Sequence, residues 1–228
     1  MGVSSSLTQE KCRGASRSAL LCLVQHFRAV HEPPLQGGMA VVNYDPKKHD
    51  RRSIRLKGYD YSSPGQYFVT ICVRNGVCSL GDIVDGEMIY SDYGRIVAKT
   101  WLWLAEQYDY VSLDEWGLMP NHMHGILDYA DNTIDRGASR TAPTVIRKPL
   151  GHIVGAFKTV STKEINELRG TPGAPFWQRD FWDHIIRNER ALNAIREYMG
   201  NNPICWEADK LHPAAKINPF NKSWKRPK

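Results

Sequence analysis

The sequence predicts an α+β domain of ferredoxin-like architecture, an antiparallel four-stranded sheet with helices on one face. Segments rich in β-branched and aromatic residues alternate with segments of helical periodicity, in the order β-α-β-β-α-β-α. The second and third strands are separated only by a Pro120-Asn121 turn, which makes them antiparallel neighbours, and the other strands are joined through helices. We expect the two crossover helices to cover one face of the sheet and to leave the other free to meet nucleic acid.

Three segments predict the first half of this fold. Residues 67–73 (Tyr-Phe-Val-Thr-Ile-Cys-Val) have the β-branched and aromatic composition that is typical of a strand. Residues 80–91 contain a Gly-Asp and an Asp-Gly pair, which indicate a small hairpin. Residues 92–107 carry apolar side chains at nearly helical spacing, and Ser91 or Asp92 could cap this first crossover helix.

The central segments complete the sheet. Residues 111–119 and 122–128 form the second and third strands. Residues 129–149 are rich in Asp, Thr, Arg and Gly, and we expect a surface loop there. Residues 150–168 again show helical spacing and form the second crossover helix, and residues 176–186 should contain the fourth strand.

A third helix is predicted from residue 189 to about 201, with Asn188 as its N-cap and its end before Pro203. Its apolar stripe is formed by Leu192, Ile195 and Met199. Tyr198 lies roughly 90° from the centre of that stripe, which neither forces nor excludes burial. Asn202 is four residues further on, so the two side chains are neighbours at the helix end. Without the His122–His124 pair, the residues of this helix would favour Tyr198 as a rim aromatic that shields the core.

The net charge of +6 and a pI near 9.1 favour a polyanionic partner, nucleic acid first. We expect a poorly ordered extension over residues 1–46, a domain over 47–206 and a basic tail over 207–228. One basic cluster contains a single acid, Asp50, and could contact DNA phosphates or form a solvated face. Its members are Lys47, Lys48, Arg51, Arg52, Arg55 and Lys57.

The cysteines and the hydropathy pattern indicate a cytoplasmic protein. The five cysteines are odd in number and form no CxxC pair, which argues against a disulfide scaffold and a zinc ribbon and fits a reducing cytosol. The apolar run at 19–24 is too short to cross a membrane and is a poor signal peptide. We therefore expect no membrane partner.

Two histidines are the strongest chemical signal in the chain. Side chains at positions i and i+2 of a strand point to the same face, so His122 and His124 would project together while Met123 points into the core. Two imidazoles on a stiff strand make half of a site for a divalent metal. A chance pairing beside a turn is the competing interpretation, because the chain has eight histidines.

Three motifs together match a known family. Residues 119–125 read Met-Pro-Asn-His-Met-His-Gly, and residues 176–188 read Phe-Trp-Gln-Arg-Asp-Phe-Trp-Asp-His-Ile-Ile-Arg-Asn, followed by Tyr198 and by Asn202-Pro203. With the opening at 51–61, they resemble the REP-associated tyrosine transposases, a branch of the single-tyrosine HUH (insertion-sequence-200-like) transposases. The resemblance covers about residues 44 to 206. The His-hydrophobe-His triplet is weakly specific, whereas the combination is highly specific.

This resemblance implies a transposase that cleaves and rejoins single-stranded DNA near small hairpins through a 5′-phosphotyrosine. Tyr198 is then the nucleophile, His122 and His124 hold Mg²⁺ or Mn²⁺, and Asn202 is the third metal ligand. His184 lies in the matched block, where we expect it to make a structural hydrogen bond near the site. The implied partner is single-stranded DNA with a REP-like hairpin, bound in the nucleoid by a monomer or a homodimer.

Two other functions compete with strand transfer. A domesticated, non-cleaving DNA-binding protein could use the same sheet, although the chain keeps His122, His124, Tyr198 and Asn202. An RNA-binding module is disfavoured, because neither the first nor the third predicted strand has the glycine-aromatic signature of such modules.

Overall fold

The computed structural model describes residues 55–56, 58–130 and 147–215. Three predicted features lie outside the described residues. They are the extension at 1–46, the tail beyond 215, and the basic residues Lys47, Lys48, Arg51, Arg52 and Lys57. The strands are β1 (Gly65–Cys72), β2 (Gly81–Val84), β3 (Glu87–Tyr90), β4 (Val111–Met119), β5 (His122–Tyr129) and β6 (Trp182–Ile186). The helices are α3 (Asp92–Gln107), α4 (Leu150–Arg169) and α5 (Glu189–Asn201), with short 3-10 turns η1 (Arg74–Gly76) and η2 (Trp206–Ala208).

The main sheet has four strands in the order β4-β5-β1-β6, and every neighbouring pair is antiparallel. This order confirms the predicted α+β class and the split βαβ arrangement. The hairpin of β2 and β3 forms a separate two-stranded sheet. The fourth strand is shorter than the segment that predicted it, because only an isolated bridge between Val73 and Trp177 precedes it.

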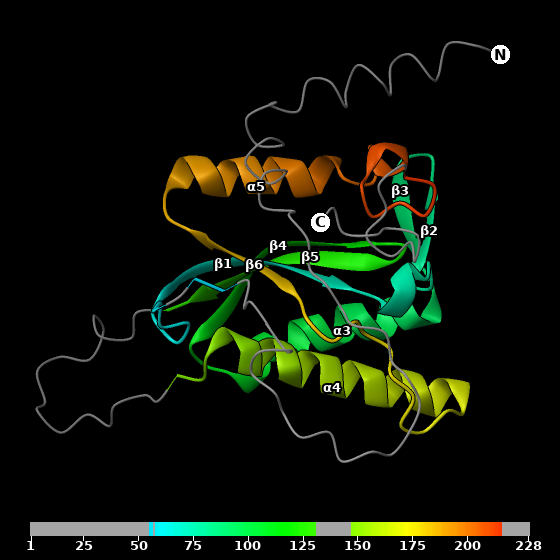
Figure 1. The fold of residues 1–228 in the computed structure, drawn as a ribbon, viewed down its shortest axis with the longest axis horizontal. Coiled ribbons are helices and arrows are strands. Elements are labelled where there is room, and N and C mark those ends of the chain that lie inside the picture. Colours follow the sequence, from blue (N-terminus) through cyan, green and yellow to red (C-terminus); the bar gives the residue numbers. More distant parts are fainter. Residues whose placement is uncertain (1–54, 57, 131–146, 216–228) are drawn as a thin grey trace, which may run out of the picture.

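The crossover helices α3 and α4 pack together against one face of the main sheet (Figure 1). The core between them contains the fully buried Trp101 of α3 and Phe157 of α4, whose rings meet edge to face at 5.4 Å between centroids. Ser91 caps α3 by accepting a hydrogen bond from the Gly94 N–H, as predicted. Gly170 ends α4 in the left-handed conformation, with φ of 63°, which favours glycine.

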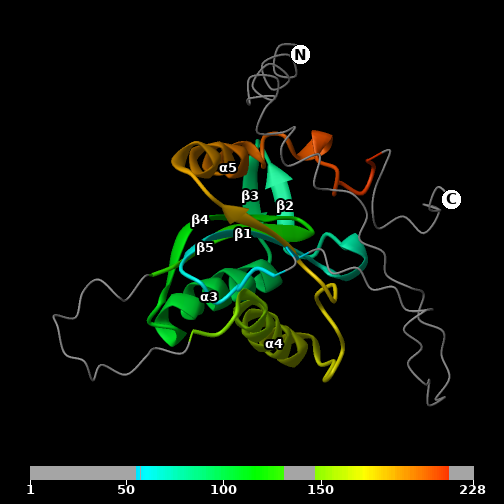
Figure 2. The same cartoon turned by 60° about the vertical axis from the view of Figure 1, so that its left-hand side comes forward.

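The opposite face of the sheet is not free, contrary to our expectation. Helix α5 lies across it, on the other side from α3 and α4 (Figures 1 and 2). A second hydrophobic cluster joins the stripe of α5 to the sheet: Phe68, Ile126, Ile186, Leu192, Ile195 and Met199. Burial of that stripe requires an apolar surface, and the α3–α4 side is already filled. The Asn188 side chain caps α5 by accepting from the Ala191 N–H, as predicted.

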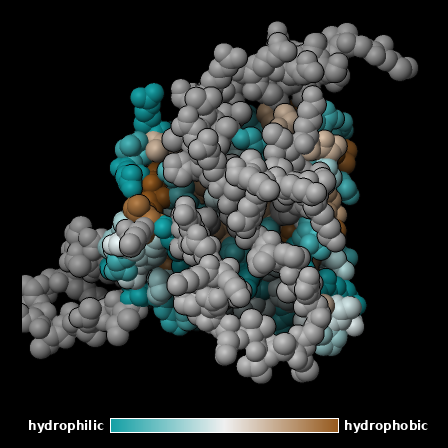
Figure 3. All heavy atoms as spheres, in the orientation of Figure 1, coloured by the Kyte–Doolittle hydropathy of each residue, from teal (hydrophilic) through white to brown (hydrophobic). Residues whose placement is uncertain are grey.

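The first part of the expected tail packs against the domain. Residues 202–211 turn back beside the β2–β3 hairpin, where a Cβ on Gly86 would lie 3.3 Å from the Ile204 side chain. Leu211 is buried at 3% exposure. The part of the described surface that is visible in Figure 3 is mostly hydrophilic. Within the described residues no helix is long and apolar enough to cross a membrane.

Candidate active site

Strand β5 places His122 and His124 side by side on the face that carries α5. Both are buried, with exposures of 0% and 2%, and their Nε2 atoms are 3.0 Å apart. Met123 between them is fully buried in the α3–α4 core. The predicted alternation therefore holds, and both imidazoles present the same nitrogen to one point.

Asn121 fixes the ring of His122. Its Nδ2 donates to the carbonyl oxygens of Gly76 at 3.2 Å and of Leu211 at 2.7 Å, so its Oδ1 is the atom 2.8 Å from His122 Nδ1. An amide oxygen can only accept, so His122 Nδ1 must carry the proton. In the neutral imidazole, His122 Nε2 then holds a lone pair.

Strand β1 holds His124 from the other side. Thr70 is its cross-strand partner, and the Thr70 Oγ1 lies 2.8 Å from His124 Nδ1. The Phe68 ring stacks on the same imidazole at 5.3 Å between centroids. Burial lowers the pKa of His122 to about 3 and lowers the pKa of His124 well below its usual value, with the neighbouring His122 as a further cause. Both rings are therefore neutral, which is the metal-binding form.

Tyr198 on α5 lies directly above the histidines. Its hydroxyl oxygen is 3.4 Å from His124 Nε2, and the two ring centroids are 5.4 Å apart. Burial raises the pKa of the phenol, the nearby Asp209 carboxylate raises it further, and the Asn202 side chain opposes that rise. Tyr198 is thus a protonated phenol at neutral pH, held beside two ring nitrogens.

Asn202 and Asp209 bring further polar atoms to the same place. Asn202 is 5% exposed, and its Nδ2 has no hydrogen-bond partner in the described part of the chain. Asp209 was not predicted. Its side chain is 7% exposed, its Oδ2 lies 3.9 Å from His122 Nε2, and its Oδ1 accepts from the Leu211 N–H. Burial raises the pKa of this carboxyl. No sequence pattern distinguishes this acid in its irregular segment.

The two histidine Nε2 atoms could ligate one divalent cation. Two ligand atoms about 2.1 Å from an octahedral ion and at right angles to each other are separated by about 3.0 Å, the distance between these nitrogens. Each opposite ring nitrogen is held by a hydrogen bond, as is usual for histidine ligands. No three His, Cys, Asp or Glu side chains among the described residues form a metal-binding group. The buried side chain of Asn202, whose amide oxygen is a possible ligand atom, is the further group that fits.

Two other predicted site residues have different surroundings. The Arg55 guanidinium lies over the Phe181 and Tyr61 rings, at 5.0 and 5.5 Å, and 3.8 Å from Asp183. Its side chain is 37% exposed, so DNA contact by Arg55 stays a prediction. His184 on β6 pairs with Phe68 on β1, and β1 separates it from the strand that carries His124. Its structural role also stays a prediction.

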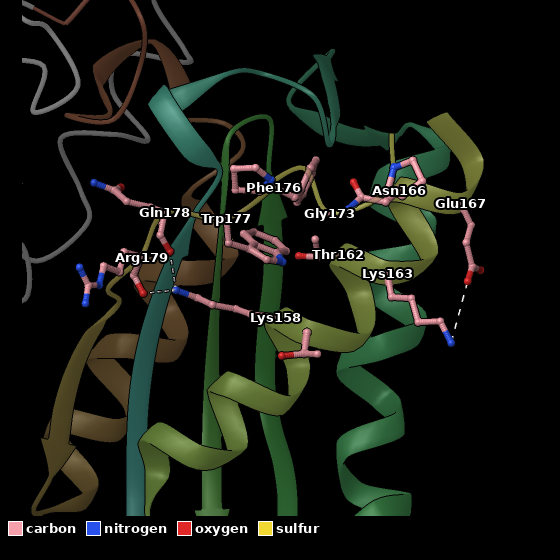
Figure 4. Close-up of a pocket in the computed structure, with 13 residues that line it drawn as sticks. Lys158, Thr162, Lys163, Asn166, Glu167, Gly173, Phe176, Trp177, Gln178 and Arg179 are labelled. Carbon is pink, nitrogen blue, oxygen red and sulfur yellow. Dashed lines mark hydrogen bonds and ion pairs between the residues drawn. The ribbon is translucent and has the colours of Figure 1, made fainter. Parts of the chain in front are cut away.

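A groove with a volume of about 730 Å³ lies elsewhere, along α4 (Figure 4). None of the predicted site residues lines it. At its edge Lys158 Nζ donates to the carbonyl oxygens of Gln178 at 2.7 Å, Arg179 at 3.3 Å and Asp180 at 2.9 Å. These bonds fix the segment that leads into β6 and leave the ammonium group of Lys158 occupied.

The fold and this site define an α+β protein with a buried histidine pair beneath a tyrosine helix. No family model matches the chain. A protein of Haemophilus influenzae, described only as uncharacterized, is 36% identical over 176 residues, which cover 74% of this chain and 97% of that protein. The chain therefore belongs to the same family as this Haemophilus influenzae protein.

Two solved structures are similar at low identity. A REP-associated tyrosine transposase bound to a REP hairpin is 18% identical, with a TM-score of 0.47 over 68% of this chain and 76% of that one. A candidate transposase from Deinococcus radiodurans is 16% identical, with a TM-score of 0.36 over 64% of this chain and 95% of that one. At these values neither likeness carries a functional argument.

Proposed function

We propose that this protein is a single-tyrosine transposase that cleaves and rejoins single-stranded DNA near small hairpins. The observation that carries the proposal is the Tyr198 hydroxyl 3.4 Å from His124 Nε2, over a histidine pair whose Nε2 atoms converge. The motif resemblance implies a role for the same residues and supports the proposal independently of this geometry. Two further parts of the proposal rest on that resemblance alone. They are hairpin-containing DNA as the partner, and a monomer or homodimer as the active form of the protein.

The reaction uses one oxygen of this chain. The Tyr198 oxygen attacks the scissile phosphorus, an O–P bond forms, and the bond from phosphorus to the 3′ oxygen breaks. The products are a 5′-phosphotyrosine on Tyr198 and a free 3′-OH on the other strand end, because the leaving oxygen gains one proton while the phenol loses one. In rejoining, a 3′-OH attacks the same phosphorus and Tyr198 leaves, so no ATP is needed because the phosphoester bond is conserved.

The resting site opposes formation of the attacking phenolate. Burial and the Asp209 carboxylate both raise the pKa of Tyr198. The Tyr198 phenol can therefore lose its proton only when a positive charge is bound near its oxygen. A divalent cation, Mg²⁺ or Mn²⁺, when held by His122, His124 and Asn202, would supply that charge and polarise the phosphate oxygens. Asp209, 3.9 Å from His122 Nε2, adds the negative charge that favours cation entry.

Covalent capture of labelled hairpin DNA tests the proposal. We expect wild-type protein to form a denaturant-resistant adduct with Mg²⁺ or Mn²⁺ and none in EDTA. Tyr198→Phe removes only the attacking oxygen, so the adduct should vanish while the melting temperature barely changes. Tyr129→Phe is the matched control, because the Tyr129 hydroxyl is buried without a partner in the described part of the chain. It should form the adduct normally.

Three results would contradict this function. A persistent adduct with Tyr198→Phe would assign the nucleophile to another residue. An adduct formed fully in EDTA by the His122→Ala, His124→Ala double variant would refute the metal chemistry. Hairpin binding without any adduct would instead indicate the domesticated, non-cleaving protein.

A further inference from the structure

We propose that the Thr70 hydroxyl is a positioning group that lets His124 change which ring nitrogen carries its proton when a cation binds. The inference rests on the proposed function, because it concerns the same histidine pair. It assigns a role to a residue that no motif singled out. Thr70 is 1% exposed and sits directly across from His124 in the β1–β5 register.

The starting tautomers follow from hydrogen-bond geometry. Asn121 Oδ1 can only accept, so His122 carries its proton on Nδ1 and a lone pair on Nε2. His124 Nε2 lies 3.0 Å from that lone pair. Two lone pairs at this distance repel, so in the ion-free protein His124 Nε2 must carry a proton and donate it. His124 Nδ1 is then an acceptor, and the Thr70 hydroxyl donates to it at 2.8 Å.

The ion-bound site needs the opposite arrangement at His124. Both Nε2 atoms must offer lone pairs to one cation, so the His124 proton must reside on Nδ1. That N–H can donate only if Thr70 Oγ1 accepts. A hydroxyl does both by rotating about its Cβ–O bond, whereas an amide or carboxylate oxygen could serve only the ion-bound form. The proton that leaves Nε2 passes to solvent water and the proton that arrives at Nδ1 comes from solvent water, so the ring stays neutral and no net proton is released.

The surroundings of Thr70 allow this rotation. A cavity of about 20 Å³ adjoins the side chain and is lined by Thr70, Cys72, Gln178, Asp180, Phe181 and Trp182. This volume is large enough for one water molecule, which could accept a hydrogen bond from the hydroxyl when Thr70 turns its O–H away from His124. By contrast, Asn121 is locked by two backbone carbonyls and holds His122 in one tautomer. The two histidines are thus supported in different ways.

Two measurements on the full chain test the role of Thr70. ¹⁵N NMR of the imidazoles should show His124 protonated on Nε2 in the metal-free protein and on Nδ1 with Mg²⁺, with His122 protonated on Nδ1 throughout. Titration calorimetry with Mn²⁺ should show a roughly 10- to 100-fold weaker affinity for Thr70→Val, because the His124 N–H is left without an acceptor. Thr70→Ser keeps the hydroxyl and should restore the affinity.

Thr100→Val is the matched control. Thr100 is 2% exposed in α3, and its hydroxyl donates to the Ile96 carbonyl on the far side of the sheet from the histidines, so its loss should leave Mn²⁺ affinity unchanged. Wild-type affinity in Thr70→Val, weak affinity in Thr70→Ser, or Nδ1–H on His124 before the ion binds each overturns the proposal. A wild-type protein that shows the tautomer change but forms no Tyr198 adduct refutes the proposed function and supports the role of Thr70.

Discussion

Arg196 and Asp114 fasten the tyrosine helix to the edge of the sheet. Arg196 Nε donates to Asp114 Oδ1 at 2.9 Å, and Nη2 donates to Oδ2 at 2.5 Å. Asp114 lies where the pairing of β4 with β5 shifts register between Leu113 and Trp116. Arg196 is two residues from Tyr198, so this two-point contact holds the turn of α5 that carries the proposed nucleophile.

Loss of this contact should slow chemistry more than it weakens the fold. Asp114→Asn removes the charge, and the freed helix turn should move Tyr198 away from its 3.4 Å position, lowering the single-turnover rate of adduct formation by roughly 10- to 100-fold. Hairpin affinity should change little. Lys99→Met, which breaks an exposed ion pair with Glu164 on the opposite side of the sheet, is the control. Equal rates in both variants would show that the contact does not position the tyrosine.

The contact should also persist in acid. The hydrogen bonds from Arg196 lower the pKa of Asp114 below its usual 3.8, despite partial burial. A lowered folded-state pKa contributes stability that is present above the unfolded value and is lost only as pH falls through the lowered pKa. The Arg196–Asp114 ion pair should therefore remain intact across the pH range in which DNA cleavage can be assayed.

The histidine pair should make the fold less stable as pH falls. Burial lowers both histidine pKa values, to about 3 for His122. Below about pH 6.5 these histidines are therefore protonated in the unfolded chain but not in the folded one, which lowers the free energy of unfolding. The titratable groups Asp209, Tyr198 and Cys72 lie beside the pair. The raised pKa of Asp209 has the opposite effect on stability, because it favours the folded state as pH falls.

The measurement is the melting temperature between pH 7 and pH 5 in EDTA. Wild-type protein should lose stability over this interval, and the double variant His122→Gln, His124→Gln should lose markedly less. Parallel curves would mean that neither ring is held neutral by the fold. At pH 7, EDTA itself should leave the melting temperature unchanged, because the pair sits on a sheet with its own core.

Gly125 should tolerate no side chain. A Cβ at this position would lie 2.4 Å from the Trp101 indole, which is fully buried under the sheet. Gly125→Ala should therefore destabilise the protein by about 3 kcal/mol, because a rigid ring in a packed core cannot yield. Gly117 on β4, which pairs with His124, has no described atom within 4 Å of such a Cβ, so Gly117→Ala is the matched control. Urea denaturation of both variants measures the difference, and equal midpoints would contradict this packing.

Periodicity was enough to predict most of the fold, because the strands and helices bury regular stripes. It could not tell which face of the sheet receives α5, since the stripe of Leu192, Ile195 and Met199 shows only which side of the helix is buried. The nucleic-acid face that we expected to be open is consequently the face that carries the tyrosine helix.

The candidate site divides in the same way. The His122–His124 pair was predicted from its spacing on a strand, whereas Tyr198 was predicted only from the resemblance to a known family. Thr70 and Asp209 were missed, because a threonine in a strand is ordinary and an acid in an irregular segment has no period. One supporting residue could have been found from the sequence. Asn121 precedes His122, and an amide side chain at that position can hold the imidazole by a hydrogen bond.

The order in which the site is assembled has a consequence for synthesis on the ribosome. The histidines and their strand partners are made early, but Tyr198 and the carbonyl of Leu211 that holds Asn121 come from near the C-terminus. A chain still being translated therefore exposes an imidazole pair without Tyr198 above it. Under the proposed function, such a chain cannot cleave nearby DNA until α5 has emerged and docked.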